Sequence, residues 1–152
     1  MKAIADHIFE LAQQIADRTP GFHDCKGPGK DAGNGVTNEF LRALDIAVSD
    51  NWPVKVRQQE PVAPGVKYSF DYFIPSEDTA VEIALSIRNI VTEFEKDIFK
   101  AILANESGKQ VRRLVLIGKT GAVKRQNGTG PNAIKAWVKQ RCNIQIDVME
   151  LL

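Results

Sequence analysis

Two acidic residues, Asp71 and Glu82, stand in otherwise apolar stretches on either side of a short turn. Both stretches are rich in β-branched and aromatic residues, which predicts the two strands of a hairpin. If residues 75–78 form a four-residue loop, Ile74 pairs with Thr79 and Asp71 lies directly opposite Glu82. Opposed Cβ atoms in an antiparallel pair lie about 5 Å apart, so the two carboxylates are expected to share one face.

Two like charges at this separation destabilise a hairpin unless a cation relieves them. Neither histidine and neither cysteine is near Asp71 or Glu82 in the sequence. Oxygen ligands alone favour Mg²⁺ or Mn²⁺, so a metal site is one interpretation of the acid pair. The alternative is that the acids face solvent or pair with a lysine or arginine of a neighbouring element. A register shift of one residue would also place them on opposite faces.

The same register predicts the surroundings of the acids. On the face with Asp71 and Glu82, small residues predict a concave space: Ser69, Ala80, Ala84 and Ser86. The other face is predicted to be core, with these residues: Tyr68, Phe70, Tyr72, Ile74, Val81, Ile83, Leu85 and Ile87.

The elements that must position the hairpin follow from apolar periodicity. Helices are predicted over 2–17, 37–48, 90–104 and 131–141. Strands are predicted over 54–59, 65–74, 79–87, 111–118 and 143–151. Glycine-rich loops are expected at 21–35 and 118–130. This order predicts an α/β fold, a mixed central sheet flanked by helices, in a single domain covering residues 1–152.

Composition limits the classes of partner. The formal net charge is +1, so any basic surface must be local. The two cysteines form no CxxC pair, and no apolar run of 18 residues is present, which favours a reduced, cytoplasmic protein without a membrane partner. The amphipathic first residues contain acids and do not have the pattern of a secretory signal.

With Asp71 followed after ten residues by Glu82, Ile83 and Ala84, the chain resembles the PD-(D/E)xK superfamily, and type II restriction endonucleases in particular. In that family an aspartate ends one hairpin strand and an acid-x-lysine motif lies on the next. The resemblance implies a restriction-endonuclease-like core of helix, three strands, helix and strand, over about residues 37–118. The C-terminal helix and strand are additions to this core.

The resemblance also implies site residues. Asp71, Glu82 and the backbone carbonyl of Ile83 are expected to bind Mg²⁺ or Mn²⁺. The family's further acid corresponds to Glu39, for which a favourable interaction with the helix dipole is the alternative role. Ala84 departs from the family pattern, which has lysine there.

Three lysines are candidates to replace the missing one in catalysis. Lys67 is the diagonal neighbour of Ala84 in the predicted register, and Lys96 and Lys100 lie on the following helix. Arg88, just past the strand, is a further substitute. For each, a solvated surface position is the alternative.

The implied function is that of a metal-dependent nuclease that hydrolyses phosphodiester bonds of nucleic acid, with DNA as the expected substrate. The alternative is a catalytically decayed nuclease-fold module that binds nucleic acid or a protein partner. The final strand alternates as an exposed edge does, and by analogy with enzymes that act on two strands it suggests a homodimer.

Both glycine-rich loops carry cations that are candidates for contacts with the nucleic-acid backbone: Lys26 and Lys30 in the first loop, and Lys119, Lys124 and Arg125 in the second. Glycine allows a backbone to approach phosphates closely. Solvated loops of the same composition are the alternative.

Overall fold

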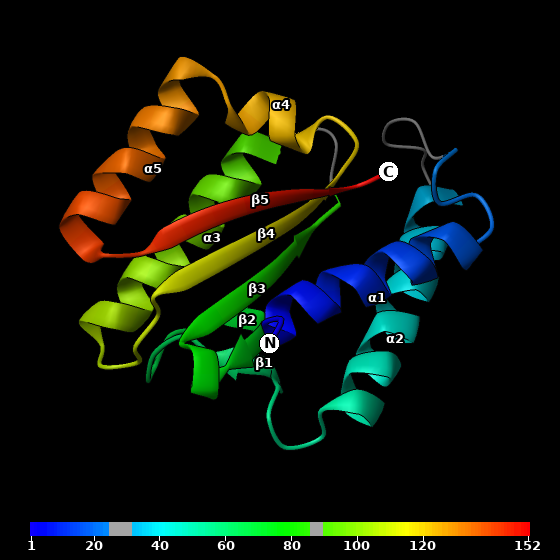
Figure 1. Ribbon diagram of the computed structural model, residues 1–152, viewed down its shortest axis with the longest axis horizontal. Coiled ribbons are helices and arrows are strands. Elements are labelled where there is room, and N and C mark those ends of the chain that lie inside the picture. Colours follow the sequence, from blue (N-terminus) through cyan, green and yellow to red (C-terminus); the bar gives the residue numbers. More distant parts are fainter. Residues whose placement is uncertain (25–31, 86–89) are drawn as a thin grey trace.

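The computed structural model describes residues 1–24, 32–85 and 90–152. Its helices are α1 (Ile4–Arg18), α2 (Ala32–Asn51), α3 (Ile90–Glu106), α4 (Ala122–Gln126) and α5 (Thr129–Cys142) (Figure 1). Its strands are β1 (Arg57–Pro61), β2 (Ser69–Ile74), β3 (Thr79–Ala84), β4 (Arg113–Lys119) and β5 (Gln145–Leu151). Within these ranges, no helix has the length and apolar character needed to cross a membrane.

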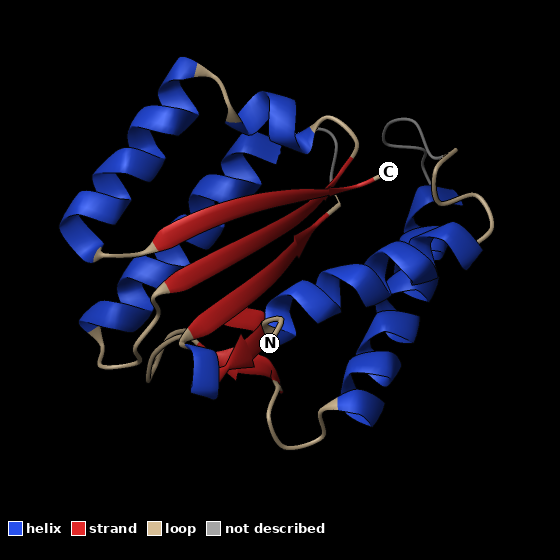
Figure 2. Cartoon of the chain, in the orientation of Figure 1, coloured by secondary structure: helices blue, strands red, loops and turns tan. Residues whose placement is uncertain are grey.

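The five strands form one mixed sheet in the order β1-β2-β3-β4-β5 (Figure 2). Strand β2 runs antiparallel to β1 and β3, whereas β3, β4 and β5 are parallel. Parallel neighbours need crossover connections, which α3 supplies between β3 and β4, and α4 and α5 supply between β4 and β5. The predicted mixed α/β architecture is therefore confirmed, and β5 forms one edge of the sheet.

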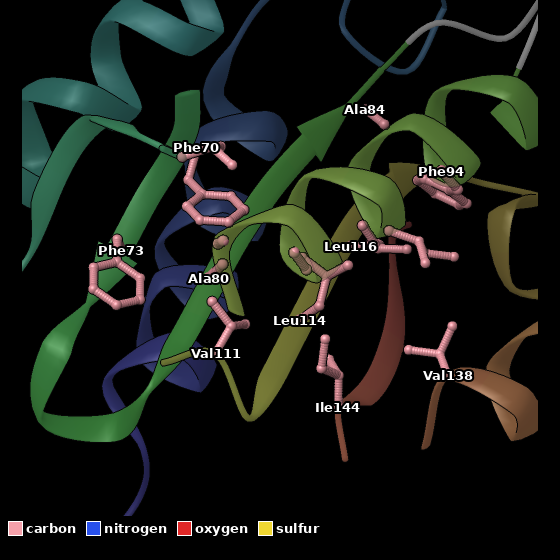
Figure 3. Packing of buried hydrophobic residues seen from close by; sticks show 14 of the residues in the cluster. Phe70, Phe73, Ala80, Ala84, Phe94, Val111, Leu114, Leu116, Val138 and Ile144 are labelled. Carbon is pink, nitrogen blue, oxygen red and sulfur yellow. The ribbon is translucent and has the colours of Figure 1, made fainter. Parts of the chain in front are cut away.

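Helices cover both faces of the sheet and create two cores (Figure 1). The α3-side core lies under α3, α4 and α5, and its packing is seen in Figure 3. The α1-side core lies under α1 and α2. Strand β4 serves both: Leu114 and Leu116 belong to the first, and Val115 and Ile117 to the second. Burial on both faces explains why this strand is an almost continuous apolar run.

The predicted hairpin register is correct. Ile74 pairs with Thr79 and Tyr72 with Val81, as a loop over residues 75–78 requires. A single 3₁₀ turn, Pro75–Glu77, makes this loop, and Asp78 closes it in the left-handed conformation with φ 47°.

Several element predictions were wrong, most of them at a boundary. Helix α2 begins at Ala32 rather than near residue 37, so glycines that indicated a loop lie within its first turn. The short helix α4 was expected to be loop. Strand β1 begins at Arg57 rather than at residue 54. Glycine content is a weak local signal that tertiary packing can override, which explains the first two differences.

The face assignments of the hairpin hold only in part. Tyr72, Ile74 and Val81 lie in the α1-side core as predicted. Phe70 lies instead in the α3-side core, and Tyr68 is 43% exposed. The β1–β2 ladder lacks a pair between Gln59 and Asp71, and Gln59 has φ 48° at this point. This irregularity lies next to Phe70 in the ladder, the residue whose ring is on the unexpected face.

The predicted concave space beside the acids is filled. Ala80 and Ala84 are buried in the α3-side core, because α3 packs directly over them. Small side chains here allow a helix to approach the sheet closely rather than leaving a hollow.

A substitution at Gly118 tests how closely the C-terminal end of β4 is packed. A Cβ at this position would lie 2.7 Å from the Cβ of Ala122 and 3.4 Å from Cζ of Phe94. We expect Gly118→Ala to lower the free energy of unfolding by about 1–3 kcal/mol, measured by urea denaturation. Gly130→Ala is the matched control, because nothing lies within 4 Å of its added methyl group. Equal stability of the two variants would contradict this packing.

Candidate functional site

Asp71 lies where the two strands of the hairpin stop pairing. The β2–β3 ladder includes Tyr72 and Val81 but does not continue to Asp71 and Glu82. Instead, the backbone N–H of Ile83 donates a hydrogen bond of 2.8 Å to Asp71 Oδ2. The side chain thus takes the place of a backbone acceptor, which holds the half-buried carboxylate against β3.

Glu82 is buried on β3 at 3% exposure and contacts a cation from α3. The Lys100 Nζ lies 2.5 Å from Glu82 Oε1, and this oxygen has no further hydrogen-bond partner among the described residues. The same ammonium lies 3.2 Å from Asp97 Oδ1, one helical turn earlier. Lys100 and Asp97 are only 6% and 4% exposed, so the whole ion cluster is shielded from water. We call Asp71, Glu82, Asp97 and Lys100 the acid cluster.

Burial and mutual repulsion shift the proton affinities in the acid cluster. Burial raises the pKa of Glu82, the charges of Asp97 and Asp71 raise it further, and Lys100 opposes the shift. Burial likewise raises the pKa of Asp97 against the opposing effect of Lys100. Burial alone would lower the pKa of Lys100, but its two carboxylate neighbours outweigh that effect and raise it. The lysine is therefore held as a cation, and the carboxylates resist ionisation.

The acid cluster has more acids than cations. Three carboxylates and one ammonium leave a formal charge of −2 when all are ionised, at positions that are largely dry. A divalent cation would neutralise this charge, and carboxylate oxygens are the ligands that Mg²⁺ and Mn²⁺ prefer. The donor chemistry therefore fits such an ion.

The ligands are not converged on one point in this arrangement. Over residues 1–24, 32–85 and 90–152, no three His, Cys, Asp or Glu side chains form a ready metal-binding group. Lys100 contacts both buried acids and occupies the place where their oxygens would meet. Cation binding therefore requires the lysine to release Glu82.

Of the three candidate lysines, only Lys100 contacts the acid pair. Lys67 is exposed just before β2. Lys96 is also exposed and forms an ion pair of 2.8 Å with Glu93. Glu39 is exposed on α2, in the layer that covers the opposite face of the sheet. Arg88 lies outside the described residues.

The second glycine-rich loop is largely occupied by internal contacts. The Lys119 Nζ donates a hydrogen bond of 3.1 Å to the backbone carbonyl oxygen of Phe22 and lies 4.5 Å from the centroid of the Phe22 ring. Glu150 accepts hydrogen bonds from the backbone N–H groups of Gly121, at 2.8 Å, and Val123, at 3.4 Å. These two N–H donors are therefore already satisfied by a carboxylate of the chain itself.

The remaining predicted cations have different positions. Lys124 and Arg125 are exposed on α4. Lys26 and Lys30 fall outside the described residues. The structure therefore does not bring the predicted basic loops to the acid cluster through any described contact.

Asp97 is the member of the acid cluster that the sequence analysis missed. A signal was present: Asp97 lies between Phe94 and Ala101 on the stripe of α3 that faces the sheet. An acid on a buried stripe, three residues before a lysine, indicates an internal ion pair.

A separate cleft of about 680 Å³ lies away from the acid cluster. It is formed by the segment after β1 and the turn between α3 and β4. Lys109 and Arg57 both pair with Glu60, at 2.6 and 3.3 Å, and Asp78 accepts a hydrogen bond from Gln110, so the charged groups that line the cleft are already engaged.

The raised pKa of Glu82 predicts a pH dependence of stability. A carboxyl group that binds its proton more tightly in the folded state stabilises the fold below its unfolded pKa, near 4.5, and loses that contribution as the pH rises. In EDTA, we expect the stability of the unsubstituted chain to fall from pH 5 to pH 8, by up to about 1.4 kcal/mol per pH unit. Glu82→Gln should flatten this slope.

Urea denaturation across this pH range measures the effect. Glu93→Gln is the control, because Glu93 pairs with Lys96 at the surface, and it should follow the unsubstituted chain. Parallel slopes for all three proteins would show that the burial of Glu82 does not govern its protonation.

Comparison of the chain with models of known protein families, with curated proteins and with solved structures finds no match. The interpretation of the acid cluster therefore depends on its own geometry and on the sequence resemblance. The resemblance to the PD-(D/E)xK superfamily stays a prediction.

Proposed function

We propose that the chain is a divalent-metal-dependent nuclease that hydrolyses phosphodiester bonds of nucleic acid. The observation that carries this proposal is the contact between the Lys100 ammonium and the Glu82 carboxylate. Lys100 thus supplies, from α3, the positive charge that the family's lysine supplies at the position of Ala84.

The arrangement of elements supports the proposal. Helix α2 is followed by β1, β2 and β3, then by α3 and β4, which is the order that the resemblance implies. The hairpin register brings Asp71 and Glu82 to adjacent strands with the Ile83 N–H between them. A restriction-endonuclease-like core is our proposal for this α/β fold.

The chain's residues have distinct roles in the proposed reaction. Asp71 and Glu82 would hold Mg²⁺ or Mn²⁺, which would supply an activated water and neutralise charge on the phosphate. Asp97 retains the ammonium of Lys100 when Glu82 is engaged, because it already contacts the same nitrogen. Lys100 then stabilises the negative charge that develops on the phosphate.

The second candidate function is a decayed nuclease-fold module that binds nucleic acid or protein. The closed ion pair favours it: Lys100 is 6% exposed and its charge is directed to internal acids. In such a module the lysine has replaced the metal ion for structural purposes. A homodimer formed through the edge strand β5 is a further proposal, which the mass in solution by light scattering tests.

Calorimetric titration with Mn²⁺ separates the two functions. We expect saturable binding to the unsubstituted chain and its loss in Asp71→Asn. Lys100→Met should bind Mn²⁺ more tightly, because the competing ammonium is gone. Lys96→Met is the control and should change Mn²⁺ binding far less, since the Lys96 ammonium forms its ion pair with Glu93 at the surface. No binding to any variant would support the decayed module.

Cleavage of a mixture of DNA and RNA substrates tests catalysis itself. We expect hydrolysis with Mn²⁺ or Mg²⁺ and none in EDTA. Lys100→Met should reduce the rate about 100- to 1,000-fold, the usual effect of removing one group that stabilises transition-state charge. Lys96→Met should retain the rate. Tight metal binding without any cleavage would contradict the enzymatic proposal.

A further inference from the structure

Two aromatic rings remain uncovered beside the acid cluster. Phe99 on α3 is 53% exposed and Tyr68, just before β2, is 43% exposed. Their centroids lie 6.4 Å apart with the ring planes at 86°, an edge-to-face contact. The neighbouring rings Phe70 and Phe94 are fully buried. The exposure of this one pair therefore needs an explanation other than a shortage of core space.

The two rings are attached to ordered backbone. Phe99 lies in the middle of the 17-residue helix α3. The carbonyl oxygen of Tyr68 accepts a hydrogen bond of 3.0 Å from the N–H of Val62, which fixes the approach to β2. Rings held in this way lose little conformational freedom when a flat ligand stacks on them.

The pair adjoins the proposed reaction centre. Tyr68 precedes Asp71 by three residues, a distance of about 10 Å along an extended strand. Phe99 directly precedes Lys100 on α3. The two rings thus meet where the chain enters β2 beside α3, and the acids of the hairpin lie next to them, Asp71 on β2 and Glu82 on β3. A strand of nucleic acid with a phosphate at the acid cluster would have a nearby base within reach of the rings.

The charges around the rings favour stacking over phosphate binding. Lys67 and Lys96 are exposed on this surface, but so is Glu95, and Lys96 already pairs with Glu93. These acids offset the charge of the neighbouring lysines, which lowers the affinity of this surface for duplex phosphates. A base bound by stacking must be unpaired, because a duplex keeps its base faces covered.

We propose that Tyr68 and Phe99 form a stacking platform for an unpaired base, and that the nucleic acid recognised by this site is single-stranded. This inference rests on the proposed nuclease function, whose substrate class it names. Base–aromatic stacking tolerates every base, so the platform selects strand state rather than sequence.

The test is binding of a single-stranded oligonucleotide containing 2-aminopurine, in EDTA so that no cleavage occurs. We expect quenched fluorescence on binding to the unsubstituted chain. Phe99→Ala and Tyr68→Ala should each weaken binding about 10-fold and reduce the quenching. Phe99→Trp should retain both. Trp137→Ala is the matched control, because Trp137 is equally exposed, at 53%, but lies on α5.

The outcomes distinguish this inference from the proposed function. If Phe99→Ala weakens oligonucleotide binding but the unsubstituted chain cleaves nothing in Mn²⁺, the stacking platform is supported and the nuclease proposal is rejected. Cleavage with unchanged binding by Phe99→Ala and Tyr68→Ala would overturn the platform alone. Equal affinity for duplex and single strand would also overturn it. The platform would likewise be overturned if light scattering showed a dimer that dissociates in the Phe99→Ala variant, since the rings would then bind a second copy of the chain.

Discussion

An acidic side chain buried in a sheet can ionise only if positive charge lies beside it, and α3 is placed so as to supply that charge to Glu82. The Lys100 ammonium lies 2.5 Å from Glu82, and its charge is shared with Asp97. The ring of Phe70 lies 6.0 Å from the same nitrogen and helps to exclude water. Loss of the lysine would leave two buried acids without this cation, so the contact helps to hold α3 over β3, together with the apolar residues of α3.

The rest of the α3-side core follows from this placement. Ala80 and Ala84 are small enough for α3 to approach β3, and Gly118 allows the same for α4 on β4. The sheet is thus covered closely on the face that bears the acids. A polar cluster and a close-packed apolar layer coexist there because the buried acids Glu82 and Asp97 contact the buried ammonium of Lys100, and the half-buried Asp71 accepts a hydrogen bond from a backbone donor.

The sequence alone predicted what depends on local spacing. The four-residue loop was enough to predict the hairpin register, and the apolar run over residues 111–118 was enough to predict strand β4. Which of Lys67, Lys96 and Lys100 contacts the acid pair was not predictable, because this contact depends on how α3 is rotated over the sheet. The position of Phe70 depends on the irregularity at Gln59, which no local pattern signals. Asp97 carried a signal, since an acid on a buried stripe needs a partner.

The contacts of Arg113 have a consequence for the order of folding during synthesis. This guanidinium joins Asp6 of α1, at 2.9 Å, to Asp147 of β5, at 2.6 Å. In addition, Glu77 in the hairpin turn accepts a hydrogen bond from the backbone N–H of Ile4. Helix α1 is synthesised before these partners, and it can pack against α2 as soon as α2 has emerged. Its polar contacts with the sheet, however, become possible only with the hairpin and β4, and the bridge to Asp147 only with β5. Completion of the α1-side core is therefore a late event in the folding of the nascent chain.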